Sequence, residues 1–411
     1  MKKIAKTVWY TWNHLSLIVR TLIGLTLGVV AALMFPGATW IRIFGEIFVQ
    51  VLKAIAPILV LVLVTSAIAN AGGGVGRRFT NVIILYTLTM LLASVIAVVA
   101  SFLFPVTLQL SDVVNVAAPK GIGAVLESLI LSIVANPIDS LMHANYIGVL
   151  AWSIIFGLAL KKIAIESTKY AVRDLSNAIS QAVAWIINLA PLGIMGLIFT
   201  AVSENGLGIF RDYGYLLSVL VGCMLFIGLV ANPFVVGFCL RRNPYPLVFR
   251  CLRESGLTAF FTRSSAANIP INMAICEDLN LDRNMYSISI PLGAAINTSG
   301  AAVVITIMTL AAAHTLGISI DFWSSVLLSI VTTVAACGAS GIAGGSLLLI
   351  PVACSLLGIP DDVAMQVVGI GFIIGVIQDS VETAINSSSD VLFTATAEFM
   401  EWRKEGREIR F

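Results

Sequence analysis

Residues 262–270 read TRSSAANIP and interrupt an apolar stretch that runs from about 246 to 280. Residues 338–346 read GASGIAGGS and interrupt a second apolar stretch, from about 322 to 357. In hydrocarbon, irregular backbone persists only where protein or a water-filled cavity satisfies its polar groups. The two breaks therefore predict paired re-entrant helical hairpins whose turns meet at a binding site near the membrane midplane. Two pairs of short crossing helices would give the same hydropathy pattern and remain the alternative on this pattern alone.

The composition of the whole chain indicates a membrane protein. Of its 411 residues, 58% are hydrophobic and 11% are charged, whereas soluble domains carry about 25% charged residues. The formal net charge is only +2, and no basic tract is interleaved with aromatic residues, so a nucleic-acid partner is not expected. The six cysteines form no CxxC pair or cluster with histidine, which argues against a metal or disulfide framework.

The remaining apolar stretches are long enough to cross a bilayer, which takes about 20 helical residues. We expect spans at 15–35, 41–70, 79–104, 129–160, 177–202, 214–240, 286–313 and 362–396. If the N-terminus is cytoplasmic, the outside loops of the first half hold only Lys120 and Arg211, and the basic tail at 403–410 is also inside. The predicted fold class is therefore an all-α polytopic protein of the plasma (inner) membrane, with eight transmembrane helices, two re-entrant hairpins and both termini in the cytoplasm.

A polar stripe in the last span is the strongest functional signal. Its members share one helical face, at offsets of 0, 3, 4, 7 and 11 residues: Asp379, Glu382, Thr383, Asn386 and Asp390. Because a carboxylate at membrane depth costs at least about 2.5 kcal/mol to insert, we expect the three acids to face cations, hydrogen-bond donors or water. A role in helix packing alone is the alternative, and it would leave the carboxylates without counter-charges.

The two interrupted regions supply complementary groups. Arg263 can neutralise Asp379 or Glu382, and the oxygens that remain suit a hard cation such as sodium. A substrate carboxylate would meet the hydroxyls of Ser264 and Ser265 and the N–H groups of a helix N-terminus. In the span at 286–313, the polar residues 297–299 between glycines predict local unwinding that frees carbonyls for an ion, although a small-residue helix contact is the alternative.

These residues resemble the dicarboxylate/amino acid:cation symporter family, whose members have the glutamate-transporter fold. The resemblance covers essentially the whole chain, and is carried by six spans followed by TRSSAANIP, by NTSG at 297–300, by GASGIAGGS and by QDSVETAINSSSD at 378–390. It implies a homotrimer in which a transport domain moves as an elevator against a scaffold. The implied boundaries are scaffold at 1–78 and 105–213, transport domain at 79–104 and 214–396, and a cytoplasmic tail at 397–411.

The resemblance also implies roles for individual residues. Asp379 is similar in position to the aspartate that holds the substrate amino group. The other substrate contacts that it implies are Ser264, Ser265, Thr383 and Asn386. From their places in the two breaks and the stripe, we add Arg263, Glu382, Gly341 and Gly344 to the expected substrate site. The sodium site that it implies consists of Gly293, Asn297, Asn386 and Asp390, to which we add Thr298 by its position beside Asn297. The segment from Gly338 to Ser346 resembles the extracellular gate that closes over the substrate and a second sodium.

Two departures from the family pattern narrow the expected function. Acidic-substrate members carry an arginine three residues after the amino-binding aspartate; Glu382 stands there and would repel a substrate side-chain carboxylate. We therefore expect sodium-coupled import of serine and threonine, with other neutral amino acids or dicarboxylates, driven by sodium or protons, as the alternative. Ser299 replaces an aspartate found in many members, and Met90 and Ala93 offer no side-chain oxygen, so a further sodium site is not expected.

Two other classes of protein fit the sequence less well. A channel needs a continuous polar pore, whereas the polar residues here concentrate in two breaks and two spans. A membrane-embedded serine hydrolase needs a base beside Ser264 or Ser265. The three histidines, at 14, 143 and 314, lie at segment ends or outside the expected site. We therefore expect no enzymatic activity, and as partners an amino acid, sodium, the lipid bilayer and further copies of the chain.

Overall fold

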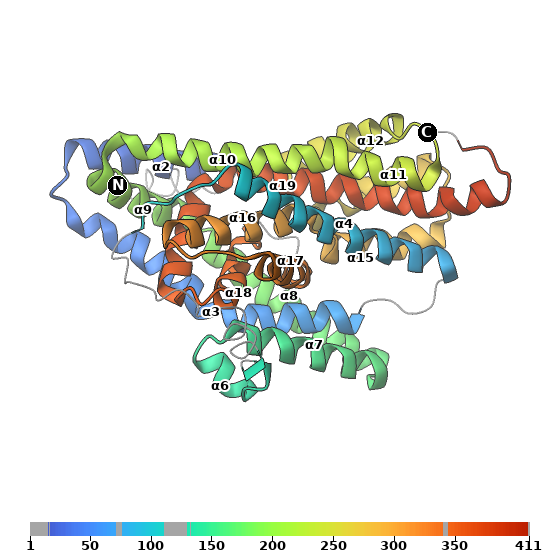
Figure 1. Ribbon diagram of the computed structural model, residues 1–411, viewed down its shortest axis with the longest axis horizontal. Helices are drawn as coiled ribbons and strands as arrows, with labels where there is room; N and C mark the ends of the chain where they lie inside the picture. Colours follow the sequence, from blue (N-terminus) through green and yellow to red (C-terminus); the bar gives the residue numbers. More distant parts are fainter. Residues whose placement is uncertain are drawn as a thin grey trace, which may run out of the picture.

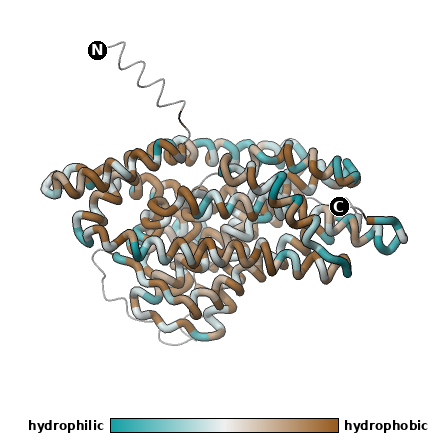
Figure 2. The backbone as a smooth tube through the Cα atoms, turned by 90° about the horizontal axis from the view of Figure 1, so that it is seen from above, coloured by the Kyte–Doolittle hydropathy of each residue, from teal (hydrophilic) through white to brown (hydrophobic). Residues whose placement is uncertain are grey.

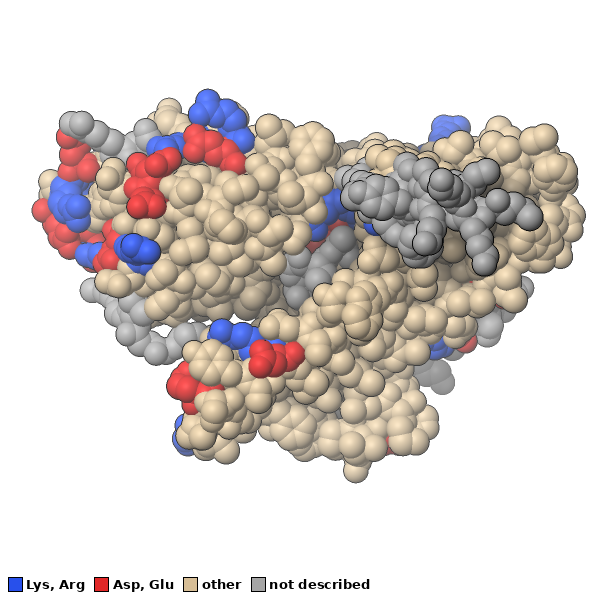
Figure 3. Space-filling model, turned by 180° about the vertical axis from the view of Figure 1, so that it is seen from behind, with Lys and Arg blue, Asp and Glu red and all other residues tan. Residues whose placement is uncertain are grey.

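The computed structural model describes residue 15 and residues 17–70, 76–110, 130–131, 133–339 and 344–409. The described residues form helices and connecting turns, without strands, and the longest helices run along the long axis of the molecule (Figure 1). Most of the tube in Figure 2 has the colour of hydrophobic residues. On the face in Figure 3 the charged side chains gather mainly toward one end, which leaves a wide uncharged surface of the kind that lipid covers.

One group of helices comes from the first half of the chain. Its members are α2 (Leu17–Met34), α3 (Arg42–Asn70), α7 (Tyr146–Ile163), α8 (Glu166–Ile187) and α9 (Ala190–Asn205). α2 packs along α9, and α3 packs against α7, α8 and α9. Glycines allow this close approach, because a Cβ atom on Gly24 would lie 2.1 Å from the Pro191 carbonyl oxygen and one on Gly196 2.3 Å from the Gly45 nitrogen. Small residues at helix contacts are typical of packing in membranes.

A second group is organised around the long C-terminal helix α19 (Asp361–Lys404). Its other members are α4 (Gly76–Leu103), α10 (Ile209–Phe226), η3 (Ile227–Ala231), α11 (Asn232–Leu240), α12 (Tyr245–Cys251), η4 (Leu252–Gly256), α13 (Leu257–Thr262), α14 (Ser265–Asp278), α15 (Arg283–Ile296), α16 (Ser299–Thr315), α17 (Phe322–Ala336), η5 (Leu347–Leu349) and α18 (Ile350–Leu356). α19 contacts α4 and every helix from α10 to α16, and α4 packs on α16 and α17. The polar stripe therefore lies on the helix around which this group packs.

The two groups meet along α19. Lys53 of α3 ties them together: its Nζ lies 2.6 Å from Asp362 Oδ1 and 3.0 Å from Asp361 Oδ2, at the start of α19. α9 and α3 also pack on α19, and α7 packs on α18.

Several expected spans agree with single helices or helical runs. Among the described residues, six runs are long and apolar enough to cross a membrane: 39–70, 78–103, 146–163, 190–240, 283–315 and 361–404. α2 is a shorter apolar helix that coincides with the first expected span. In the run 190–240, Gly206 (φ 67°) ends α9 and turns the chain into α10, so this run contains the expected span at 214–240.

The expected spans at 129–160 and 177–202 differ from the structure, and part of the first lies outside the described residues. Ala144 adopts a left-handed conformation (φ 51°) that separates α6 (Pro137–Met142) from α7. α8 and α9 are separated at Asn188 and Leu189, and Pro191 follows near the start of α9. Proline has no N–H to continue the preceding helix, so the chain bends there.

Each interrupted stretch contains two helical parts. At the first turn, Arg263 ends α13 in a left-handed conformation (φ 52°), and the Ser264 hydroxyl caps α14 by accepting from the Ala267 N–H at 3.2 Å. In the second break, residues 344–346 form a turn before η5, which we call the second turn, and residues 340–343 fall outside the described residues. Between the two interrupted stretches, α15 and α16 are separated at Asn297 and Thr298, which confirms the predicted unwinding.

Candidate functional site

Both turns meet on the carboxylate of Asp379, within α19. Arg263 Nε donates to Oδ2 at 2.6 Å, and the Gly344 N–H donates to Oδ1 at 3.2 Å. Asp379 is only 3% exposed, and the Arg263 side chain is 10% exposed. The sequence left open whether Arg263 pairs with Asp379 or with Glu382. In the structure it pairs with Asp379, and this short charged hydrogen bond is of the strong kind.

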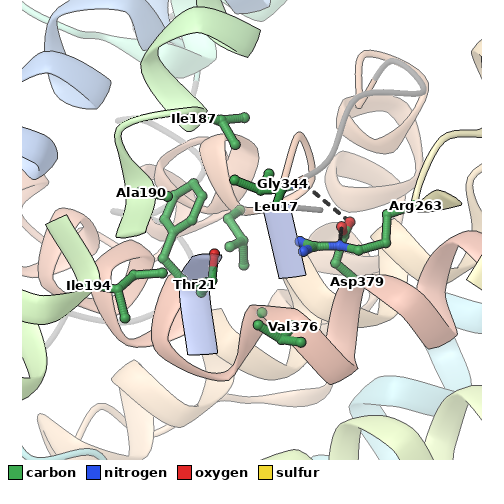
Figure 4. Close-up of a pocket in the computed structure, with 12 residues that line it drawn as sticks. Leu17, Thr21, Ile187, Ala190, Ile194, Arg263, Gly344, Val376 and Asp379 are labelled. Carbon is green, nitrogen blue, oxygen red and sulfur yellow. Dashed lines mark hydrogen bonds and ion pairs between the residues drawn. The ribbon is translucent and has the colours of Figure 1, made fainter. Parts of the chain in front are cut away.

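A small cavity of about 20 Å³ adjoins this ion pair. Figure 4 shows the Arg263 side chain directed at the Asp379 carboxylate, with Leu17, Ala190 and Ile194 among the residues of the opposite wall. Those residues come from α2 and α9. A space of this size holds about one water molecule. An amino acid is several times larger, so it can enter only after the turns or the facing helices separate.

Glu382 faces the second turn rather than the cavity. Its Oε2 accepts from the Ser346 hydroxyl at 2.7 Å and from Gln378 Nε2 at 2.5 Å. The carboxylate is thereby held between α19 and the start of η5. Thr383, the next residue of the stripe, donates its hydroxyl to the backbone carbonyl of Asp379 at 2.7 Å.

The expected sodium ligands come together where α15 and α16 separate. Asn297 Nδ2 donates to Asp390 Oδ1 at 2.9 Å, and Asn386 Oδ1 accepts from the Gly300 N–H at 2.8 Å. Gly293 lies against the same carboxylate, since a Cβ on it would be 2.6 Å from Asp390 Oδ1. Thr298 differs from the other four, because its hydroxyl donates to the Ala336 carbonyl at 2.6 Å.

Two oxygens of this group fit a hard cation. Asn297 Oδ1 and Asp390 Oδ2 are buried and have no hydrogen-bond partner among the described residues. A buried carboxylate oxygen without a donor is costly. Carboxylate and amide oxygens are ligands that hard cations prefer, so this donor set suits sodium carried as cargo.

Some expected residues contribute differently or cannot be placed. Gly341 lies outside the described residues. Ser264 caps α14, and Ser265 is buried in the first turn of that helix, 5% exposed. The hydroxyl of Ser299 is buried without a partner among the described residues. Met90 offers its sulfur to the Thr298 N–H at 3.4 Å, so α4 does reach the break between α15 and α16.

Sequence reasoning assigned no role to Gln378 or Tyr86, and no partner to Ser346. Gln378 lies four residues before Glu382, the spacing at which helix side chains meet, and this signal could have identified it. Ser346 was included only as the end of the second break. Tyr86 of α4 places its hydroxyl 3.3 Å from the Asp390 carbonyl and from Thr394 Oγ1. A single tyrosine in an apolar span carries no positional pattern, so nothing in the sequence pointed to it.

Comparisons with known proteins show the family of this chain. Residues 17–399 match the family described as the sodium:dicarboxylate symporter family. The serine/threonine transporter SstT of Bifidobacterium adolescentis is 57% identical over 413 residues, which span 100% of this chain and 96% of that protein. The expected resemblance is thus confirmed, and with it the expectation of a transporter rather than an enzyme. The chain belongs to the sodium:dicarboxylate symporter family and is a multi-pass membrane transporter.

Proposed function

We propose that this chain imports serine and threonine together with sodium across the plasma membrane. One observation carries the proposal: two turns from different helix pairs close on a buried aspartate of α19, in a protein 57% identical to a serine/threonine transporter. Asp379 receives the α-ammonium of the substrate once the turns open. Ser264, Ser265, Thr383, Asn386 and the glycine-rich turn with Gly341 and Gly344 surround the rest of the amino acid.

Glu382 supports a neutral substrate. Its carboxylate is fixed beside the second turn by Ser346 and Gln378, one helical turn from Asp379. A second carboxylate brought close to it would be repelled. The family description, which mentions dicarboxylates, favours acidic substrates as the second candidate.

Sodium coupling is supported by the donor-free oxygens of Asn297 and Asp390. The set of Gly293, Asn297, Thr298, Asn386 and Asp390 would hold the ion after small adjustments of the break between α15 and α16. Since the stripe contains no histidine, a proton-driven mechanism would have to use its carboxylates, whereas the donor-free oxygens favour a hard cation.

The two packing groups support the proposed division into scaffold and transport domain. α2, α3, α7, α8 and α9 would form the scaffold, and the helices around α19 the moving part of an elevator. α14 has 14 residues and α17 has 15, fewer than the roughly 20 that a bilayer needs, so both helix pairs would enter and leave the membrane on one side. The homotrimer and the cytoplasmic termini belong to the same proposal.

Uptake into proteoliposomes tests the function. Labelled serine, threonine, alanine, aspartate and glutamate are offered with a sodium gradient, with a proton gradient, and with neither. We expect accumulation of serine and threonine with the sodium gradient alone. Equal uptake from a proton gradient without sodium would contradict the coupling, and preferred uptake of aspartate or glutamate would contradict the substrate.

A further inference from the structure

Arg263 holds the place that the substrate ammonium needs. Both oxygens of Asp379 already have donors, Arg263 Nε at 2.6 Å and the Gly344 N–H at 3.2 Å. The adjoining cavity is about 20 Å³. Each carboxylate oxygen can accept a second hydrogen bond, but a cavity of this size leaves no room for an amino acid beside the two donors. An ammonium group therefore reaches this carboxylate when one of the two donors makes way.

Arg263 is the donor that can leave without moving a helix. Its backbone is fixed as the end of α13, where its N–H donates to the Ala259 carbonyl at 2.8 Å. Its guanidinium sits at the end of a long side chain with several rotatable bonds. Gly344, by contrast, donates through its backbone, so its contact breaks only when the second turn itself moves.

The cavity itself offers the guanidinium no other acid to pair with. Among the described residues that line it, Asp379 is the only acid; on the facing wall Leu17, Ile187 and Ile194 are apolar, and Thr21 adds one hydroxyl. Glu382 does not line the cavity, and its Oε2 accepts from Ser346 and Gln378. A guanidinium released from Asp379 therefore needs an anion that arrives with the substrate.

We propose that Arg263 is an internal substitute for the substrate ammonium, which neutralises Asp379 in the unloaded carrier and is displaced when an amino acid binds. The inference rests on the proposed function. A zwitterionic substrate opens the ion pair: its ammonium takes Asp379, and its carboxylate becomes the partner of Arg263. The buried charges are then balanced in the unloaded carrier as well as in the loaded one.

This arrangement matters for one step of the transport cycle. Net uptake requires the carrier to return unloaded, whereas exchange of one substrate for another moves it only in the loaded form. Without Arg263, the unloaded carrier would return with a buried carboxylate that has lost its counter-ion, which is unfavourable. Removal of Arg263 should therefore slow net uptake more than exchange.

Matched vesicle assays separate the two steps. Labelled serine is offered with a sodium gradient to empty vesicles (net uptake) and to vesicles preloaded with unlabelled serine and sodium (exchange). For Arg263→Met we expect the ratio of net uptake to exchange to fall about tenfold or more. A buried carboxylate without its counter-ion is unfavourable, so fewer unloaded carriers can pass through the return step. Arg263→Lys keeps the charge and should restore part of the ratio.

Arg253→Met is the control, since Arg253 lies on the same helix pair with a 78% exposed side chain paired to Glu254. It should leave the ratio as in the unaltered protein. An equal fall of net uptake and exchange in Arg263→Met would overturn the proposal, as would an unchanged ratio. Elution as a single species in size-exclusion chromatography establishes that each variant is folded.

A second measurement does not depend on transport. Thermal unfolding of the substrate-free protein should show that Arg263→Met lowers Tm, and that the loss is smaller when Asp379→Asn is already present. Additive changes in Tm would overturn the pairing. If the unaltered protein transports no serine or threonine, the proposed function fails, and this double-mutant cycle still decides whether Arg263 neutralises Asp379.

Discussion

The two turns that meet on Asp379 use different chemistry. The first turn contributes a charged side chain, Arg263, from a left-handed residue that ends α13. The second contributes a backbone N–H from Gly344 and a hydroxyl from Ser346 that binds Glu382. A side chain can change partners while its helices stay in place, whereas a backbone donor leaves only when the whole turn moves. The first turn is therefore suited to exchanging charges with the substrate, and the second to opening and closing as a unit.

Replacing Asp379 removes the carboxylate that both turns contact, and should have the largest effect. In Asp379→Asn, the substrate ammonium and Arg263 both lose their counter-ion, so we expect serine affinity to fall by at least about a hundredfold. Serine should no longer raise the Tm of the purified variant. Asp278→Asn is the control, because Asp278 belongs to the same helix group but its side chain is 68% exposed. Retained stabilisation by serine in Asp379→Asn would contradict its role.

Asp390 lies eleven residues after Asp379 on α19, so Asp390→Asn should separate sodium binding from the contacts of the two turns with Asp379. The variant keeps the shape of the side chain but removes the carboxylate whose Oδ2 has no donor among the described residues. We expect the sodium concentration for half-maximal uptake to rise by roughly thirtyfold, because ligand charge strongly tunes affinity for hard cations. Uptake rates measured across a series of sodium concentrations test this. A rise in the half-saturating serine concentration at saturating sodium, with unchanged sodium dependence, would argue against the assignment.

A substitution at Gly344 strains the backbone of the second turn and leaves the residues of the first turn unchanged. Gly344 has a φ of 73°, and a Cβ there would lie 2.9 Å from Phe372 Cε1. Gly344→Ala should therefore reduce serine uptake about tenfold, since a left-handed alanine costs about 1–2 kcal/mol before any clash.

Gly358 supplies the matched control for this strain. Its φ is 69°, and nothing lies within 4 Å of a Cβ placed on it. Gly358→Ala should lower Tm by a similar amount while uptake stays near that of the unaltered protein. Equal loss of uptake in both variants would mean that backbone strain in general, rather than closure of the second turn, limits transport.

The breaks in the helices could be predicted from sequence because they rest on local chemistry. Arg263 and Asn297 are polar residues within apolar stretches, and a chain in lipid must bend or unwind where such groups need partners. The break at Ala144 could not be predicted, because alanine is the best helix former and its left-handed conformation is imposed by packing.

The partners within the site depend on packing that spacing does not reveal. Asp379 and Glu382 lie one turn apart on the same face, so the sequence alone allows Arg263 to pair with either. The packing of the first helix pair against α19 places Arg263 on Asp379. Thr298 was grouped with the sodium ligands by its position, yet its hydroxyl is directed at the carbonyl of Ala336. Sequence therefore identified the polar stripe and its chemistry, while tertiary structure decided which members pair.

Glu382→Gln should have the smallest effect on serine affinity, and it tests most directly whether the second turn contributes to substrate selectivity as well as to closure. Glutamine retains an oxygen that can accept from Ser346, so the second turn keeps an anchor, and only the charge is lost. We expect serine affinity to fall by about threefold, the order of one neutral hydrogen bond. Aspartate, which a buried carboxylate repels, should begin to compete with labelled serine in the variant.

Competition by unlabelled amino acids in the unaltered protein completes this test. If Glu382 determines selectivity, aspartate and glutamate compete poorly before the substitution and measurably after it. Competition by alanine separates recognition of the substrate hydroxyl from selection by size. A site that binds the hydroxyl discriminates against alanine, whereas a site that selects only by size accepts alanine as well as serine. Strong inhibition by aspartate before the substitution would show that Glu382 does not exclude acidic substrates. The second turn would then contribute to closure alone, and selectivity would have to come from the first.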